Sequence, residues 1–547
     1  MPSVPQFAAR GLTKSFGGRS ILRGADLDVE AGSRIGILGP NGGGKSTMMR
    51  ILAGFDEPDA GNVTRRRGLV LAHLPQIVDG DARDPLQTVR AARPELAMLE
   101  ADLQAAEQRL ADPQLASDLD KMTRALGNHE RLLERWTQAG GDRAEGEALG
   151  HLRALGIDGD KLQTPTRELS GGQRKLVALA ACLARRPDVL LLDEPEAHLD
   201  MSRRERLGAL LDEFDGAVLM ISHDRHLLDA TVSQIAELDK GVIRMWPGNY
   251  SAYVVARQLE LEIQRQQYVT QQKEIARLED AVRRFRHWAH IRVNERAARQ
   301  ARVKQMQIDR MEKVDRPVFE RRKMALALRS SSRGGQRVLA LDGVDVGYGD
   351  DPVLLDVELV VARGERVGVV GPNGGGKTTL LRIFTEELEP VAGTRWAGDG
   401  ITLGYLSQAA GSLRDDATVL DALRAGRSLA EDAAVRLLMA FLFDYEQCRR
   451  PVGTLSGGER TRLAFLCLMQ DAPNCLVLDE PTNHLDIDSI EALEDALERY
   501  DGTVIAVSHD RYFLDRIADR IVLVADGSVE AFEGGWSANA DVVRAAA

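Results

Sequence analysis

Several features of membrane, secreted and metal-cluster proteins are missing from this sequence. None of its apolar runs approaches the roughly 20 residues that a membrane-spanning helix needs, so we expect no integral membrane segment. The N-terminus has no basic segment followed by an apolar one, and we expect no secretory signal. The four cysteines form no C-x-x-C pair, so they exclude an iron–sulfur module, give no indication of zinc and should be reduced core residues. These absences predict a soluble cytoplasmic protein.

Glycine and proline are missing from one long stretch, which begins after Gly248 and ends at Pro317. Helix formers dominate it, and we expect a two-helix arm over about residues 250–327, with its turn within 288–297. Residues 257–330 carry 19 Lys or Arg against 10 Asp or Glu, whereas the whole chain has a net charge of −12. The negative net charge of the whole chain argues against a protein that is covered by nucleic acid over its whole surface. A strongly basic arm in an acidic protein nevertheless indicates an anionic partner for the arm.

The arginines of this arm are interleaved with Phe285, His287, Trp288 and His290. Such a mixture can pair with phosphates and stack on bases, which predicts that the arm grips structured RNA. The alternative is a solvated coiled-coil spacer whose arginines balance its own glutamates. The arginines concerned are Arg283, Arg284, Arg286, Arg292, Arg296, Arg299 and Arg302.

Two glycine-rich segments match the phosphate-binding pattern G-x-x-x-x-G-K-[ST]. Glycines let successive backbone N–H groups curl around a triphosphate, and the helix that begins there adds its positive dipole end. Each segment follows an apolar run, at 35–38 and 367–370, that reads as a buried strand, so we predict two nucleotide sites in an α/β fold. The segments are Gly39, Pro40, Asn41, Gly42, Gly43, Gly44, Lys45, Ser46 and Thr47, and Gly371, Pro372, Asn373, Gly374, Gly375, Gly376, Lys377, Thr378 and Thr379.

The chain contains an internal repeat. The loop lysines lie 332 positions apart, as do Gln76 and Gln408, whereas the later motifs Leu-Ser-Gly-Gly, Asp-Glu-Pro and Ser-His-Asp recur after 286 positions. One domain was therefore duplicated, and the first copy carries 46 extra residues within about 79–159. Helix-forming segments at 94–110 and 115–136, separated by Asp112-Pro113, predict a projecting helical hairpin; the alternative is a helical subdomain packed on its own module.

The repeat and the arm divide the chain into three parts. We expect the first nucleotide-binding domain at 1–248, the basic helical linker at 249–330 and the second nucleotide-binding domain at 331–547, with no further domain after it. The apolar runs at 189–192 and 218–221 predict buried parallel strands, with polar residues at the strand ends where ligands of an open α/β sheet bind.

The order of the motifs in both halves resembles a pair of ATP-binding-cassette ATPase domains. The resemblance implies that the cassettes face each other head to tail, and that the Leu-Ser-Gly-Gly segment of each completes the ATP site of the other. Site one then comprises residues 39–47 with Gln76, Asp193, Glu194 and His223, completed by Ser456, Gly457 and Gly458. Site two comprises residues 371–379 with Gln408, Asp479, Glu480 and His509, completed by Ser170, Gly171 and Gly172.

The same resemblance implies individual roles. Lys45 and Lys377 would reach the β- and γ-phosphates, and Phe16 and Tyr348 would stack on adenine. Mg²⁺ would be held by Ser46, Gln76, Asp193, Thr378, Gln408 and Asp479. Glu194 and Glu480 would orient and deprotonate the attacking water, while His223 and His509 would contact the γ-phosphate.

The first copy departs from the family pattern at one point. Glu196 and Ala197 stand where the second copy has Thr482 and Asn483, directly beside the predicted catalytic glutamate. This change adds a negative charge near site one. We hypothesise that hydrolysis is slower there, or that the two sites are asymmetric.

Two cassettes on one chain, a helical insertion in the first and a charged arm between them resemble the ABC-F family of ribosome-binding ATPases. The resemblance covers nearly the whole chain, and the Asn-His-Leu-Asp motif at 483–486 and the run at 299–304 are typical of it. It implies that the ATP-closed form enters the tRNA exit site of the ribosome, and that the arm reaches toward the P-site tRNA and the peptidyl-transferase centre. Hydrolysis would then allow release.

Other functions stay open at this point. An ATPase that energises a separate membrane transporter is one alternative, and a DNA-associated ATPase is another. Within ABC-F, the sequence does not distinguish a housekeeping translation factor from a protector against ribosome-targeting antibiotics. Because the cassettes would pair within one chain, we expect a monomer.

Overall fold

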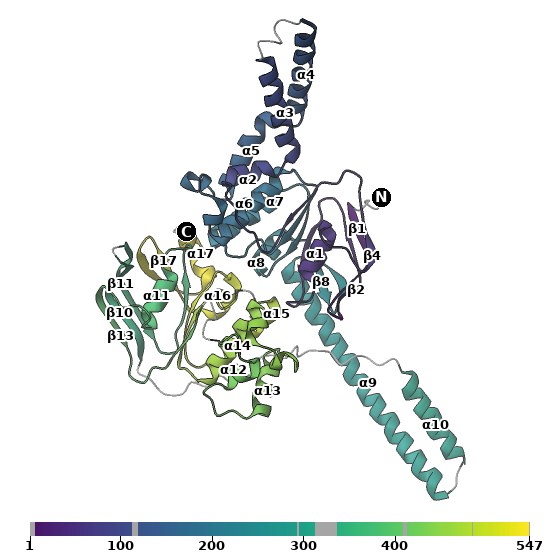
Figure 1. The fold of residues 1–547 in the computed structure, drawn as a ribbon. Coiled ribbons are helices and arrows are strands. Elements are labelled where there is room, and N and C mark those ends of the chain that lie inside the picture. The colour runs from purple at the N-terminus through teal and green to yellow at the C-terminus, as the bar shows by residue number, and fades with distance from the viewer. Residues whose placement is uncertain are drawn as a thin grey trace.

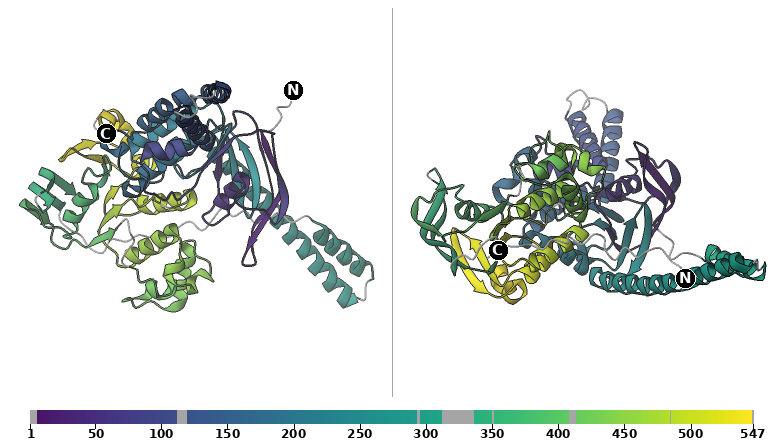
Figure 2. Two further views of the ribbon diagram at one scale, coloured as in Figure 1. Left: turned by 45° about the horizontal axis from the view of Figure 1, so that its top comes forward. Right: turned by 90° about the horizontal axis from the view of Figure 1, so that it is seen from below.

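Two α/β units lie side by side, and two helical projections leave them in different directions (Figure 1). In two further views the projection formed by α9 (Tyr250–Arg292) and α10 (Glu295–Arg310) extends away from the body of the molecule (Figure 2). The computed structural model describes residues 6–111, 119–292, 295–311, 336–349, 351–407, 413–483 and 485–545. Among the helices of these residues, none is both long and apolar enough to cross a membrane.

The molecule has four parts: two cassettes, an inserted hairpin and an arm. The first cassette runs from β1 (Phe7–Phe16) to β9 (Val242–Pro247), and the second from β10 (Arg337–Tyr348) to α17 (Trp536–Ala545). The inserted hairpin is α3 (Pro94–Leu110) with α4 (Leu119–Gln138). The arm is α9 (Tyr250–Arg292) with α10 (Glu295–Arg310).

Each cassette contains a six-stranded sheet and a three-stranded antiparallel sheet. The six-stranded sheet of the first cassette has the order β5-β6-β7-β3-β8-β9, and its strands pair in parallel except for β8 with β9. The smaller sheet has the order β2-β1-β4. The remaining strands are β2 (Arg19–Val29), β3 (Arg34–Leu38), β4 (Ala60–Arg65), β5 (Leu71–Leu74), β6 (Val189–Asp193), β7 (Ala217–Ile221) and β8 (Gln234–Asp239).

The second cassette repeats this topology. Its larger sheet has the order β14-β15-β16-β12-β17-β18, again parallel except for the last pair, and its smaller sheet has the order β11-β10-β13. The strands are β11 (Asp351–Ala362), β12 (Arg366–Val370), β13 (Ala392–Ala397), β14 (Leu403–Leu406), β15 (Cys475–Asp479), β16 (Thr503–Val507), β17 (Arg520–Ala525) and β18 (Ser528–Glu533). The apolar runs predicted as buried parallel strands are therefore confirmed as β3, β6, β7 and β12.

Helices cover the large sheets and carry the motifs. In the first cassette they are α1 (Lys45–Ala53), α2 (Pro85–Ala91), α5 (Gly141–Ala154), α6 (Gly171–Ala184), α7 (Met201–Glu213) and α8 (Arg225–Thr231). In the second they are α11 (Lys377–Phe384), α12 (Val419–Arg424), α13 (Glu431–Ala440), α14 (Gly457–Gln470), α15 (Ile487–Glu498), α16 (Arg511–Ile517) and α17. All four cysteines are buried within these cassettes and form no disulfide.

The inserted hairpin forms as predicted, although Asp112 and Pro113 lie outside the described residues. Leu99, Leu103 and Leu132 make a small apolar cluster between α3 and α4, apart from the cassette core. At its base, α5 packs into that core through Ala148 and Leu152. The hairpin thus projects from a buried helix, which favours a projecting element over a subdomain packed along its whole length.

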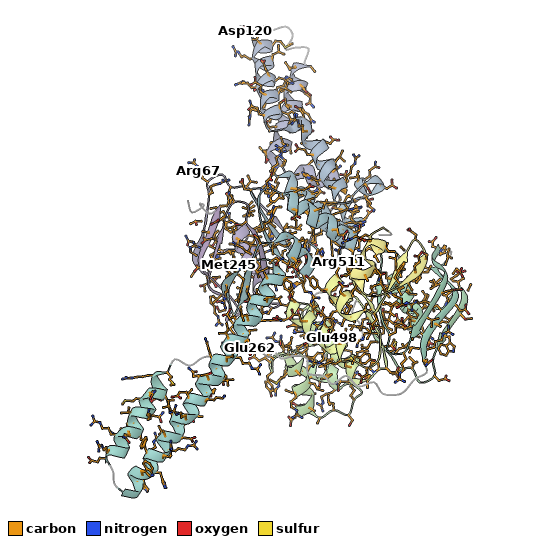
Figure 3. The ribbon with its side chains drawn as sticks, turned by 180° about the vertical axis from the view of Figure 1, so that it is seen from behind. Arg67, Asp120, Met245, Glu262, Glu498 and Arg511 are labelled. Carbon is orange, nitrogen blue, oxygen red and sulfur yellow. The ribbon has the colours of Figure 1, made fainter. Side chains whose placement is uncertain are left out.

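The arm contains the predicted pair of helices: α9 ends at Arg292 and α10 begins at Glu295, both inside the range expected for the turn. Residues 312–327 of the predicted arm lie outside the described residues. Tyr250 and Tyr253 anchor the foot of α9 in the core of the first cassette. Farther out, Leu278, Val282 and Ile308 form a separate apolar cluster that holds α10 against α9. In the view from behind, Glu262 marks the point where α9 leaves the cassettes (Figure 3).

Candidate active sites

Each phosphate loop joins the end of a buried strand to the start of a helix. The first loop follows β3 and enters α1, and the second follows β12 and enters α11. Gly44 and Gly376, which precede these helices, have φ values of 99° and 101°, in the left-handed region that favours glycine. A Cβ atom on Gly44 would lie 2.2 Å from Ile21 Cγ2, so no side chain fits there. This is the geometry that lets backbone N–H groups cradle phosphate.

The two loop lysines adopt equivalent positions. Lys45 Nζ donates hydrogen bonds to the carbonyl oxygens of Gly39 and Pro40, at 2.7 and 3.2 Å. Lys377 Nζ makes the same two bonds within its own loop, at 2.9 and 2.8 Å. Burial lowers the pKa of both lysines. Both ammonium groups therefore lie against the loops that we predict to hold the β- and γ-phosphates.

A hydroxyl group and an aspartate meet beside each loop. Ser46 hydrogen-bonds Asp193, and Thr378 Oγ1 donates to Asp479 Oδ2 over 3.1 Å. Asp193 Oδ1 is buried and has no hydrogen-bond partner among the described residues. Burial raises the pKa of Asp193 to about 6 and also raises that of Asp479. Oxygen donors with an unsatisfied buried lone pair are what Mg²⁺ prefers, so these residues fit the predicted metal sites.

The predicted catalytic glutamates directly follow β6 and β15. Glu194 and Glu480 have φ values of 48° and 50°, an uncommon backbone conformation for a residue with a side chain and one that clusters at functional sites. Glu194 Oε1 lies 3.7 Å from His223 Nε2, and Glu480 Oε1 lies 3.3 Å from His509 Nε2. Burial raises the pKa of Glu480 to about 7, while burial and the charge of Lys377 keep the pKa of His509 well below its ordinary value.

The glutamine predicted for site one reaches the catalytic group. Gln76 Nε2 donates to Glu194 Oε1 over 2.9 Å, so the structure brings these two residues together. Gln408, the counterpart in site two, lies outside the described residues. Phe16 and Tyr348 are about half exposed at the ends of β1 and β10, and their stacking on adenine stays a prediction.

The two Leu-Ser-Gly-Gly segments open α6 and α14. Ser170 Oγ accepts a hydrogen bond from Gln173 N, and the Gln173 side chain accepts one from Ser170 N, which forms a capping box. Ser456 and Glu459 form the same box in the second cassette. The pairing of these segments with the opposite phosphate loops stays a prediction.

Two aspartates to which the sequence analysis assigned no role join the cassettes at the phosphate loops. Asp486 Oδ2 accepts from the backbone N–H of Asn41 over 2.9 Å, and Asp200 Oδ2 accepts from that of Asn373 over 3.4 Å. Asn373 Nδ2 also donates to the carbonyl of His198 over 3.2 Å. The contacts are reciprocal, as a head-to-tail pair with pseudo-twofold symmetry requires. The sequence feature that could have indicated these aspartates is the His-Leu-Asp segment, which recurs after 286 positions.

Ion pairs reinforce this contact farther from the loops. Arg225 forms ion pairs with Glu494 and, at 3.0 Å, with Asp510 of the second cassette. Arg511, which occupies the matching position in the second cassette, pairs with Glu205 of the first at 2.7 Å. Figure 3 labels Arg511 at the boundary where the two cassettes meet.

The departure at Glu196 changes how one catalytic loop is held. Glu196 Oε1 accepts three hydrogen bonds, from Ser222 Oγ at 2.7 Å, His223 N at 2.8 Å and Asp224 N at 3.3 Å. In the second cassette the matching contact is a single one, between Thr482 Oγ1 and Ser508 Oγ at 3.4 Å. Burial, together with nearby Asp224, raises the pKa of Glu196. The added acid therefore acts on the backbone of the histidine loop rather than facing solvent.

Comparison with known proteins gives one consistent result. A family model described as "ABC transporter" matches residues 22–197 and 354–483, and a second with the same description matches 236–328. "ABC transporter F family member 5" of Arabidopsis thaliana is 34% identical, over 96% of this chain and 76% of the relative. "Energy-dependent translational throttle protein EttA" of Haemophilus influenzae is 34% identical, over 95% of this chain and 92% of the relative.

A solved structure supports the fold on its own. The crystal structure of a complex of archaeal ribosomal stalk protein aP1 with archaeal ribosome recycling factor aABCE1 contains a chain that superposes with a TM-score of 0.61. The match covers 97% of this chain and 92% of the other, at 19% sequence identity. Tandem cassettes arranged in one chain are therefore a known architecture.

Proposed function

The chain belongs to the ABC-F family of ATP-binding-cassette ATPases and hydrolyses ATP, and from this premise we propose that it binds the ribosome in its ATP-closed state. There it regulates translation or displaces antibiotics that target the ribosome, with the arm contacting tRNA or rRNA. A relative named as a translational throttle supports this direction. A cytoplasmic, monomeric protein is part of the proposal, since the two cassettes already bury reciprocal contacts within one chain.

The site geometry supports a specific division of labour in hydrolysis. Glu194 and Glu480 each lie within 4 Å of a histidine and at the end of a central strand, where a carboxylate can orient the attacking water and accept its proton. Lys45 and Lys377 hold charge against the phosphate loops, and the histidines contact the γ-phosphate. Bound Mg²⁺ supplies charge neutralisation at the phosphates; Asp193 with Ser46, and Asp479 with Thr378, hold it.

Closure is supported by the contacts between loops and opposite cassettes. Asp486 and Asp200 tie each phosphate loop to the other cassette through a backbone N–H, so nucleotide bound in a loop changes the boundary between the cassettes directly. The arm begins with α9, whose Tyr250 is buried in the core of the first cassette. The hydroxyl of Tyr250 also donates a hydrogen bond to Glu491 of the second cassette. Because this residue contacts both cassettes, cassette closure and arm position are mechanically linked.

The observation that carries the choice of partner is the position of the charge on the arm. Residues 257–280 hold four basic and five acidic side chains, whereas residues 283–310 hold nine basic and two acidic ones. The described part of α9 pairs several of its charges internally, for example Arg277 with Glu274 at 3.6 Å. The excess positive charge thus lies on the half of the arm that is farthest from the cassettes, where an anionic partner can reach it.

The outer half of the arm also offers surfaces suited to bases. Trp288 is 56% exposed and packs edge-on against Phe285, with ring centroids 5.8 Å apart. A groove of about 380 Å³ between α9 and α10 is lined by Phe285, Arg296, Arg299, Gln300, Val303 and Lys304. Cationic and aromatic side chains around one groove fit unstacked bases and phosphates of structured RNA better than they fit a spacer.

Co-sedimentation with 70S ribosomes tests the proposal. The chain carrying Glu194→Gln and Glu480→Gln should pellet with ribosomes in ATP and remain in the supernatant without nucleotide. Neutralising Arg284, Arg299 and Arg302 in that background should weaken pelleting and reduce its log–log salt dependence by about 2. Neutralising Arg265, Lys273 and Arg277, three exposed basic residues nearer the cassettes, is the matched control and should change pelleting little.

Three results would contradict the proposal. ATP-independent pelleting would separate ribosome binding from cassette closure. If the inner and outer substitutions changed ribosome pelleting equally, the arm would be better explained as a spacer than as an RNA-binding element. Pelleting with membranes in place of ribosomes would favour an ATPase that energises a separate transporter.

A further inference from the structure

A small cavity of about 60 Å³ lies on the boundary between the cassettes, and matching residues of both halves line it. Residues 286 positions apart face each other there: Glu196 and Thr482, Ala197 and Asn483, Arg204 and Ile490, Asp224 and Asp510. The cavity therefore lies near the pseudo-twofold axis that relates the cassettes. Two of these pairs differ in charge, because the first cassette has Glu196 and Arg204 where the second has Thr482 and Ile490. The two changes have opposite signs and occur together.

Arg204 makes contacts in both cassettes. Its Nε donates to the carbonyl of Leu199 over 3.0 Å, and its Nη1 donates to Asp224 Oδ2 over 3.0 Å. The same Nη1 reaches the carbonyl oxygen of His509, in the second cassette, at 3.4 Å. The side chain of Ile490, at the matching position, has no group that can donate a hydrogen bond. The link from Arg204 to the histidine loop of site two consequently has no counterpart running toward site one.

The electrostatic surroundings keep this arginine charged. Burial lowers the pKa of Arg204, yet the surrounding carboxylates outweigh burial and hold that pKa above its ordinary value; they belong to Asp224, Glu196, Glu480 and Asp510. Glu480 is among them, so a first-cassette cation acts electrostatically on the predicted catalytic base of site two. In turn, the charge of Arg204 opposes the effect of burial on the pKa of Glu480.

Given the roles proposed above for Glu480 and His509, we propose that Arg204 is a positioning residue for hydrolysis at site two, supplied from the first cassette. It donates to the carbonyl of His509, whose Nε2 lies 3.3 Å from Glu480 Oε1, so the His509 turn is held in this position only when the cassettes are in contact. The ion-pair partner of Arg204 in the first cassette is Asp224, at 3.0 Å, and Glu196 is a further carboxylate near it. The contact across this cavity is therefore asymmetric: Arg204 donates to the His509 turn of site two, whereas the side chain of Ile490 can donate nothing to the His223 turn of site one.

The test isolates site two in the full-length chain carrying Glu194→Gln. In that background Arg204→Ile, which copies the second cassette, should lower kcat about tenfold with the KM for ATP changed less than about twofold, because positioning and not nucleotide affinity is lost. Arg204→Lys keeps the charge and should recover at least part of kcat. The double variant Glu196→Thr, Arg204→Ile also removes one of the carboxylates near Arg204, so it should recover part of the thermal stability that Arg204→Ile loses while kcat stays low.

Arg257→Ile is the matched control. Arg257 is also a partly buried arginine that joins the cassettes, through Asp488 at 3.4 Å, but it does so at the foot of α9. Its replacement should leave kcat within about twofold of the parent. An unchanged kcat in Arg204→Ile, an equal loss in Arg257→Ile, or recovery of kcat together with stability in the double variant would each overturn the proposal. Turnover that survives in Glu194→Gln, Glu480→Gln would instead contradict the assignment of the catalytic glutamates.

Discussion

The two nucleotide sites carry the same catalytic residues but enclose them differently. In site one, the side chains of Glu194 and His223 are 16% and 15% exposed, and the two groups are 3.7 Å apart. In site two, those of Glu480 and His509 are 7% and 8% exposed and lie 3.3 Å apart. Enclosure strengthens electrostatic interactions and excludes competing water. Identical motifs therefore do not make equivalent sites.

The neighbours of the motif explain the difference. In site one, three hydrogen bonds to a single carboxylate oxygen of Glu196 fix the turn that carries His223. At the matching turn of site two, Thr482 makes a contact between two hydroxyls, at 3.4 Å, and the carbonyl of His509 accepts a hydrogen bond from Arg204 of the first cassette. The His509 turn is thus held in part from the opposite cassette, and His509 lies nearer its glutamate than His223 does. We infer that site two is the better hydrolytic site.

The largest expected effect on ATP hydrolysis comes from disabling both sites, which removes the difference between them. Replacing Glu194 and Glu480 together with Gln removes the carboxylates that accept the proton of water, and steady-state phosphate release should fall by about 10²–10⁴-fold. Binding of a fluorescent ATP analogue should persist, because the phosphate loops are untouched. Glu498→Gln, at a surface ion pair, is the control and should retain normal release. Undiminished hydrolysis in the double variant would refute the catalytic assignment.

A smaller effect is expected when the turns that carry His223 and His509 are made alike, which tests why the two sites differ. In the Glu480→Gln background, where only site one can turn over, Glu196→Thr should raise phosphate release by about threefold as the His223 turn is released. The reciprocal change, Thr482→Glu in the Glu194→Gln background, should lower release at site two. If Glu196→Thr leaves site one unchanged or slows it, the three hydrogen bonds are not what distinguishes the sites.

Local chemistry made much of this molecule predictable. The strands and helices that flank the two phosphate loops depend on residues a few positions apart, and they lie where expected. Helix α3 has the predicted bounds, because Pro94 starts it and the apolar spacing continues to Leu110. The basic arm followed from an absence of glycine and proline over one long stretch.

Contacts between distant segments could not be predicted in this way. Asn41 and Asp486 are 445 positions apart, and Arg204 and His509 are 305 apart, so no local pattern joins them. For Glu196 the sequence indicated added charge near site one, but only the fold reveals that the carboxylate binds the backbone of the His223 turn. No role was predicted for Arg204 from the sequence, because its importance depends on the fact that Ile490 lines the same cavity.

The unequal strength of the two sites is tested most directly by comparing the single variants Glu194→Gln and Glu480→Gln at saturating ATP. Equal binding of a fluorescent ATP analogue by both variants would first establish that neither substitution disturbs the nucleotide sites. We predict that Glu480→Gln then loses at least about fivefold more phosphate release than Glu194→Gln, since the enclosed site contributes most turnover. Equal losses, or a greater loss in Glu194→Gln, would contradict the account.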